Sequence, residues 1–213
     1  MNAPQARIAI IYYSSTGHVH RLAQGFADGA ADAGAEVRLR RVAELAPDAA
    51  IDSNPEWRAH LDTTSDIELA TLDDLTWANG YAFGTPTRFG NVSSQLRQFL
   101  DTTGGLWEAE NLANKPATGF TSSHFPHGGQ ESTLLSLYKT MYHWGAIILP
   151  TGYVNYNVAA AAGGNPYGVS FVEEQADDAG YQKAVLEAAR HQGERLAQAA
   201  VLLASLTSQP ATV

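Results

Sequence analysis

Short apolar runs alternate with amphipathic segments along most of this chain. Residues 8–13 are apolar almost throughout, a pattern typical of a central parallel strand that is buried on both faces. Residues 37–42 mix apolar with charged side chains, which favours a strand at the edge of a sheet. Between them, several apolar residues share one helical face, and Gly34 is placed to end that helix. They are Val19, Leu22, Ala23, Phe26 and Ala30.

The same alternation continues to the end of the chain. Further strands are expected within residues 77–84, 115–121 and 146–149, and further helices from Asn91 or Ser93 to Leu100, over 134–141 and over 181–206. Strands that alternate with helices predict an open parallel sheet with right-handed crossovers. The fold class is therefore α/β: a flavodoxin-like three-layer sandwich with a five-stranded parallel sheet of order 2-1-3-4-5, whose ligand site lies at the carboxyl ends of strands one and three.

Two polar stretches interrupt this pattern. Residues 43–76 contain Pro47, Pro55 and many acidic side chains, and we expect an irregular insertion with short helical turns. Residues 151–178 are rich in Ala, Gly and Asn and are expected to form a long loop. No internal repeat or linker divides the chain, so the sequence predicts one domain over residues 1–213 with these two insertions.

Charge and cysteine content limit the possible functions. The 213 residues carry a formal net charge of −9 and include no cysteine. The negative charge argues against nucleic-acid or anionic-membrane partners, since both require a basic face. No stretch has the length of a transmembrane helix and the N-terminus lacks a signal-peptide core, so we expect a cytoplasmic protein. Without cysteine, any redox activity needs a bound organic cofactor.

The loop after the first strand offers a phosphate site. Ser14, Ser15 and Thr16 supply hydroxyls, and Gly17 permits close approach at the start of the helix, where free amides favour an anion. The loop has neither the lysine of a P-loop nor the glycine pattern of a dinucleotide site. The alternative is a helix N-cap with spare hydroxyls, but the position after the first strand favours a ligand.

The loop after the third strand can frame a flat ring. In residues 84–91, Pro86 imposes extended geometry and two glycines permit close approach of a planar ligand. Arg88 can balance charge on a reduced flavin, or alternatively form a surface salt bridge. Phe89 can pack beside the ring or belong to the core. A phosphate at one loop and a ring at the other indicate a mononucleotide, and the ring chemistry points to flavin.

The loop after the fourth strand contributes hydroxyls and histidines. Ser122, Ser123 and the Gly128-Gly129 pair fit a segment that wraps the ring and its ribityl chain. His124 and His127 form a His-x-x-His pair, but no third ligand is evident and loop spacing does not fix their geometry, so no metal site is expected.

Other histidines are less informative. His143 either faces the crevice or is a buried structural residue, and His18 and His20 face different ways on their helix. His60 and His191 are interpreted as surface residues.

Together these motifs resemble the WrbA family, flavodoxin-like NAD(P)H:quinone oxidoreductases of type IV that bind FMN. The resemblance runs from Arg7 to about Ala200 and is most specific between Gly84 and Trp107. The segments that carry it are 14–19, 84–91, 99–101, 103–107, 127–131 and 163–168.

The resemblance implies an FMN site, NADH or NADPH as reductant, a quinone as substrate, and a homotetramer whose subunits share the active-site wall. It implies catalytic roles for Arg88 and His143 and a substrate-binding role for Trp107. The implied FMN-binding residues are Ser14, Ser15, Thr16, Gly17, His18, Val19, Pro86, Thr87, Arg88, Phe89, Gly90, Asn91, Ser122, Ser123, His124, Phe125, Pro126, His127, Gly128 and His143.

The resulting hypothesis is two-electron hydride transfer from NAD(P)H to FMN and then to a quinone. Two alternatives remain: a flavodoxin-type electron carrier that acts through protein partners, and an interaction protein that has lost the cofactor. The chain also departs from the family. Thr16 replaces a tyrosine associated with the nicotinamide cofactor, which weakens the inference of that contact, and residues 124–126 are bulkier than usual.

Overall fold

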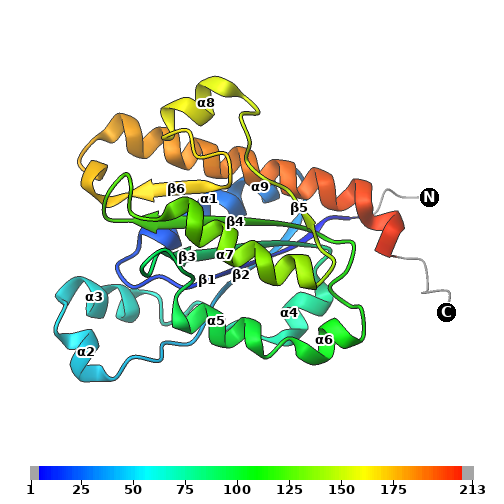
Figure 1. Ribbon diagram of the computed structural model, residues 1–213, viewed down its shortest axis with the longest axis horizontal. Helices are drawn as coiled ribbons and strands as arrows, with labels where there is room; N and C mark the ends of the chain where they lie inside the picture. Colours follow the sequence, from blue (N-terminus) through cyan, green and yellow to red (C-terminus); the bar gives the residue numbers. More distant parts are fainter. Residues whose placement is uncertain (1–4, 208–213) are drawn as a thin grey trace.

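A computed structural model describes residues 5–207 (Figure 1). Residues 1–4 lie outside this range. They belong to the N-terminal segment that was expected to lack a signal-peptide core. Of the strands, β1 spans Arg7–Tyr12, β2 Glu36–Arg41, β3 Gly80–Pro86 and β4 Pro116–Ser123. They lie in the order β2-β1-β3-β4-β5, with every pair parallel. The predicted strand order is confirmed, and β2 lies at the edge as expected.

The fifth position of the sheet is divided between two short strands. β5 (Ile147–Ile148) pairs only with Pro116 and Ala117 of β4, and β6 (Val169–Val172) pairs with Phe120 through Ser123. The carboxyl half of β4 thus pairs with β3 on one side and, on the other, with a strand from the segment expected to be a loop. That expectation was wrong: residues 151–178 also contain α8 (Tyr156–Ala161) and a 3-10 turn at Glu173–Gln175. Four buried residues are too few to produce a periodic pattern.

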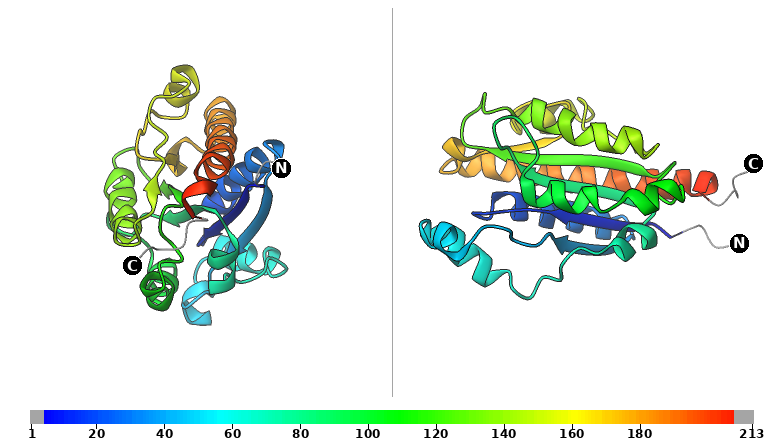
Figure 2. Two further views of the ribbon diagram at one scale, coloured as in Figure 1. Left: turned by 90° about the vertical axis from the view of Figure 1, so that its right-hand side faces the viewer. Right: turned by 60° about the horizontal axis from the view of Figure 1, so that its bottom comes forward.

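Alternate residues of β1 face two separate apolar layers. Ile8 and Ile10 pack with α1 (His18–Asp32) and α9 (Ala179–Thr207). Ala9 and Ile11 pack with α5 (Ser94–Asp101) and α7 (Gln130–His143) on the opposite face. Successive side chains of a strand point to opposite faces, so a strand that is apolar throughout serves both layers. Figures 1 and 2 show the resulting three-layer sandwich.

The first insertion folds into short helices. α2 (Asp48–Asp52) and α3 (Pro55–Thr63) lie at the end of the molecule toward which the strands point, whereas α4 (Leu72–Trp77) lies near the opposite end (Figure 1). The expected helical turns within residues 43–76 are confirmed. α6 (Gly104–Glu108) also lies at the far end from α3. No helix among residues 5–207 is both long and apolar enough to cross a membrane.

Candidate active site

A cavity of about 380 Å³ opens at the carboxyl ends of β1, β3 and β4. We call it the crevice. It falls within the range of roughly 300–1,000 Å³ usual for cofactor sites. Its lining comes from the three predicted loops, from α3 and from the 3-10 turn: Ser14, Ser15, Thr16, His18, Val19, Asn54, Glu56, Pro86, Thr87, Arg88, Ser122, Ser123, His124, Phe125, Gly128 and Glu173. The parallel sheet brings these separate loops together because the carboxyl ends of its strands share one edge.

The loop after β1 leads directly into the N-terminus of α1. Gly17 is the N-cap residue and has φ 100°, a conformation that side chains rarely adopt. Its amide donates to the Ser14 hydroxyl at 3.1 Å, and its carbonyl accepts from Arg21 at 2.9 Å. The first turn of α1 has no acidic side chain. The positive end of this helix therefore faces the crevice with hydroxyls around it, an arrangement suited to a phosphate.

The loop after β3 ends in a tight turn with two left-handed residues. Arg88 and Asn91 exchange backbone hydrogen bonds of 2.9 and 3.0 Å around Phe89 (φ 52°) and Gly90 (φ 76°), which is the pattern of a type I′ turn. The Phe89 side chain at the tip is fully exposed, so the alternative that it belongs to the core was wrong. A bulky residue in this conformation is strained. The turn thus exposes the Phe89 ring to solvent near the crevice.

Arg88 connects this turn to the phosphate loop. Its guanidinium donates to the Ser15 hydroxyl at 3.3 Å and to the Thr87 carbonyl at 3.1 Å. Among residues 5–207, Arg88 forms no ion pair within 4.0 Å, so the salt-bridge alternative was wrong. Both partners are uncharged, and the positive charge of Arg88 remains available to a ligand.

The turn is held against the loop that follows β4. The Thr87 amide donates to the Ser122 carbonyl at 2.8 Å, and the Thr133 and Thr87 hydroxyls lie 2.7 Å apart. A Cβ on Gly129 would lie 2.9 Å from the Cα of Gly90. Only residues without side chains permit this approach, so the two loops form one continuous wall.

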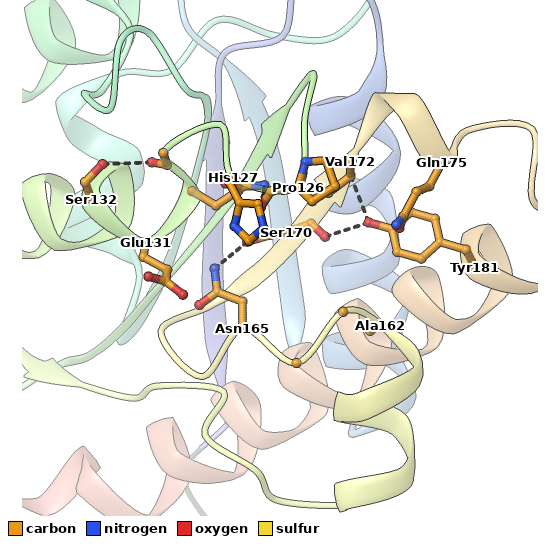
Figure 3. Close-up of a pocket in the computed structure, with 14 residues that line it drawn as sticks. Pro126, His127, Glu131, Ser132, Ala162, Asn165, Ser170, Val172, Gln175 and Tyr181 are labelled. Carbon is orange, nitrogen blue, oxygen red and sulfur yellow. Dashed lines mark hydrogen bonds between the residues drawn. The ribbon is translucent and has the colours of Figure 1, made fainter.

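The histidines of the third loop face different cavities. His124 lines the crevice, whereas His127 lines a second cavity of about 370 Å³. Figure 3 shows this second cavity between the 126–132 segment, β6 and the turn at Asn165. There the Asn165 amide donates to the Ser170 hydroxyl at 2.8 Å, and the Tyr181 hydroxyl accepts from the Val172 amide at 2.8 Å. These bonds tie β6 to its neighbours, and β6 in turn supports the wall of the crevice.

Sequence reasoning missed several residues of the crevice. Glu173 approaches His124 at 3.2 Å and His18 at 3.8 Å, and so links the third loop to α1. Asn54 and Glu56 enter from the N-terminus of α3. These residues belong to segments without a regular pattern, and only the tertiary fold places them here.

Three histidines, His18, His20 and His60, lie close together near the phosphate loop. The rings of Tyr12 and His20 stack at 5.3 Å, and the His60 ring lies 5.3 Å from that of His20. The expectation that His60 and His191 are surface residues was wrong, since both are half-buried. Burial, with smaller contributions from the neighbouring His20 and His18, lowers the pKa of His60 to about 4. Burial also lowers the pKa values of His18 and His20.

The free energy of unfolding is therefore expected to fall as the pH decreases from about 6.5 to about 4. In this window the unfolded chain protonates His60 while the folded protein keeps it neutral, so protons favour unfolding. Urea denaturation of the apoprotein across this range measures the effect. His60→Gln should reduce the slope, and His127→Gln, an exposed histidine outside the cluster, serves as the control. An equal slope in His60→Gln would contradict the assignment.

The family is visible in comparisons with known proteins. Residues 6–161 match the family model described as NADPH-dependent FMN reductase. A protein from Deinococcus radiodurans named NAD(P)H dehydrogenase (quinone) is 48% identical over 170 residues, covering 80% of this chain and 84% of that protein. A protein of the same name from Geotalea uraniireducens is 40% identical over 202 residues, covering 93% and 99%.

The chain belongs to the NADPH-dependent FMN reductase family. The resemblance to the WrbA family found in the sequence is confirmed at this level. The crystal structure of a WrbA-like flavodoxin from Agrobacterium tumefaciens superposes with a TM-score of 0.64 at 23% identity, covering 93% of this chain and 99% of that one. At this identity the likeness shows the shared fold.

The residues of the crevice fit the mononucleotide that names this FMN reductase family. Hydroxyls and helix amides provide donors at one end, and Pro86, Thr87 and Arg88 line the crevice at the other. Phe89, Gly90 and Asn91 of the turn do not line the crevice itself. Arg88 connects the two ends and carries an unpaired positive charge. The chemistry of this donor set matches a phosphate joined to a planar ring.

His143 and Trp107 lie elsewhere. Both are exposed, and the Trp107 indole donates to the His143 carbonyl at 2.8 Å. They occupy α6 and the C-terminal end of α7, at the far end of the molecule from α3 (Figure 1). Within one chain, the structure does not bring either residue into the crevice.

Proposed function

We propose that this chain is an FMN-dependent NAD(P)H:quinone oxidoreductase. The observation that carries the proposal is the convergence of a hydroxyl-rich helix N-terminus and a strained turn with an exposed aromatic tip on one crevice. Family membership and the names of relatives that are 48% and 40% identical support it.

The phosphate of FMN would be held by Ser14, Ser15 and Thr16 and by the first amides of α1. Thr87, Arg88 and Phe89 would border the ring on one side, and the 122–128 segment on the other. Bound FMN supplies the redox chemistry, because its ring accepts a hydride from a nicotinamide and gives two electrons to a quinone. Arg88 balances negative charge at the ring, since no carboxylate within residues 5–207 pairs with its guanidinium.

Turnover tests the proposal. After FMN is added, the protein should turn over NADH or NADPH repeatedly only when a quinone is present, and should form one hydroquinone per nucleotide oxidised. Without quinone and oxygen, oxidation should stop once the bound FMN is reduced. The apoprotein should be inactive under the same conditions. Tight binding of FMN without quinone-dependent oxidation would contradict the enzyme and favour an electron carrier instead.

We further propose that the chain acts as a homotetramer in the cytoplasm, with Trp107 and His143 completing the crevice of a neighbouring subunit. Support for the oligomer comes from their exposure at the far end from their own crevice, where the Trp107 indole donates to the His143 carbonyl. Exposed apolar residues on the same helices, Leu135 and Tyr142 of α7, are also suited to contact with another copy.

Mixing two inactive variants tests the shared site. Thr16→Asp should disable its own crevice, and Trp107→Ala should disable the crevice that it completes. In mixed oligomers, an intact crevice of the Trp107→Ala subunit can receive Trp107 from a Thr16→Asp subunit, so the mixture should recover a substantial part of wild-type activity. A mixture of confirmed hybrid oligomers that stays as inactive as its components would refute the sharing of residues.

A further inference from the structure

The Glu44 carboxylate, just beyond β2, receives hydrogen bonds from five donors. Two come from its own turn and fix the carboxylate in place: the amides of Leu45 (2.8 Å) and Ala46 (3.0 Å) donate to Oε1. Three come from other parts of the chain: Gln95 Nε2 donates to Oε1 at 2.8 Å, and Tyr13 Oη (2.8 Å) and Trp57 Nε1 (3.0 Å) donate to Oε2.

Each distant donor belongs to a different segment of the chain near the crevice. Tyr13 is buried and immediately precedes Ser14 of the phosphate loop. Trp57 lies in the first turn of α3, next to Glu56, which lines the crevice. Gln95 lies in the first turn of α5, directly after the 88–91 turn. Glu44 itself does not line the crevice. A single carboxylate outside the crevice thus joins the three segments through hydrogen bonds.

Only an ionised carboxylate can accept all of these bonds. Burial alone would raise the pKa of Glu44, but the hydrogen bonds from Ala46, Gln95, Tyr13 and Leu45 outweigh burial and hold this pKa below its ordinary value. Hydrogen bonds to a charged acceptor are stronger than neutral ones. If the charge were removed, at least one of these part-buried donors would lose its acceptor.

We propose that Glu44 is a positioning residue for FMN, which sets the separation of the phosphate loop, α3 and α5 without touching the cofactor. The inference rests on the function proposed above. It assigns to one side chain the coupling between the phosphate end and the ring end of the crevice.

The structure predicts how Glu44→Gln fails. The amide nitrogen of glutamine cannot replace Oε1, where it would face three N–H donors. It must replace Oε2, where the Tyr13 hydroxyl can turn to accept but the Trp57 indole N–H cannot. Replacing Trp57 by Phe removes this opposing donor, so the double variant Glu44→Gln/Trp57→Phe should recover part of what Glu44→Gln loses.

FMN titration of the apoproteins tests the proposal. We expect Glu44→Gln to raise the dissociation constant for FMN about 30-fold, which corresponds to ~2 kcal/mol. The double variant should bind FMN at least threefold more tightly than Glu44→Gln. At saturating FMN, the visible circular dichroism of the bound ring should also change. Asp74→Asn is the matched control, because Asp74 accepts from Thr71, Arg38 and Arg40 at α4, near the opposite end of the sheet. It should lower thermal stability and leave FMN affinity within twofold.

The outcomes separate this inference from the proposed function. If the wild type does not bind FMN, both fall. If the wild type binds FMN and Glu44→Gln binds it equally well, only the role of Glu44 falls. If Glu44→Gln does not fold, Trp57→Phe alone decides: it should weaken FMN binding about fivefold, and unchanged affinity would overturn the proposal.

Discussion

Replacing Thr16 by Asp is expected to weaken FMN binding at least 100-fold, or ~2.7 kcal/mol. Thr16 of the phosphate loop lines the crevice, and two carboxylates, Glu56 of α3 and Glu173 of the 3-10 turn, already line it as well. Another negative charge would oppose the phosphate directly, and like charges ~4 Å apart interact by about 4 kcal/mol at the effective dielectric constant of a protein surface. Fluorescence titration of FMN with the apoprotein measures the change.

The control is Thr16→Asn, which has nearly the same size as Asp and no charge. It should bind FMN within about threefold of the wild type. An aspartate next to the N-cap of α1 should also interact favourably with the helix dipole, by roughly 0.5 kcal/mol, so the apoprotein of Thr16→Asp should not lose stability. Equal FMN affinity in the Asp and Asn variants would show that the phosphate lies elsewhere.

Replacing Gly29 by Ala should reduce the free energy of unfolding by about 3 kcal/mol, although alanine is the better helix former. Gly29 lies where α1 and α9 touch, and a Cβ there would overlap the carbonyl oxygen of Arg190. Gly193 of α9 has the reciprocal relation to the Phe26 carbonyl. Backbone cannot yield as a flexible side chain does, so the helices must separate. Urea denaturation of the apoprotein measures the loss.

Gly104→Ala is the matched control for this prediction. A Cβ on Gly104 would meet nothing within 4 Å, and the residue begins α6. Its stability should change by less than about 1 kcal/mol. If Gly29→Ala were as stable as Gly104→Ala, the close approach of α1 to α9 would not exist in the protein.

The sheet was predictable because its central strands are short and strongly apolar. The run from Ile8 to Tyr13 serves two layers, and this is visible in sequence without any knowledge of the partners. β6 was not predictable, since four residues take strand geometry only through pairing with the carboxyl half of β4. The pattern that predicts β1 is contained in one segment, whereas β6 forms only when two distant segments pair.

The same difference divides the site. The hydroxyls of residues 14–16 and the turn at Arg88 are local motifs, and both were found in the sequence. Glu44, Glu173 and His60 act through contacts with remote residues, so no local spacing marks them. His60 lies in α3, a short insertion helix without a fully buried residue, so no apolar stripe in the sequence distinguished it from a surface residue. The bulk at Phe125, noted as a departure from the family, lies on the wall of the crevice.

Anaerobic reduction by a nicotinamide nucleotide decides whether the crevice holds a redox-active FMN. Wild-type protein and Thr16→Asp are mixed with equal total FMN and then with NADH or NADPH, and the visible absorption of the flavin is followed with time. We expect the flavin absorption to disappear rapidly with the wild type and to persist with Thr16→Asp, because only the wild-type crevice holds the phosphate. Bleaching at equal rates, or a wild type whose bound FMN neither nucleotide reduces, would contradict this expectation.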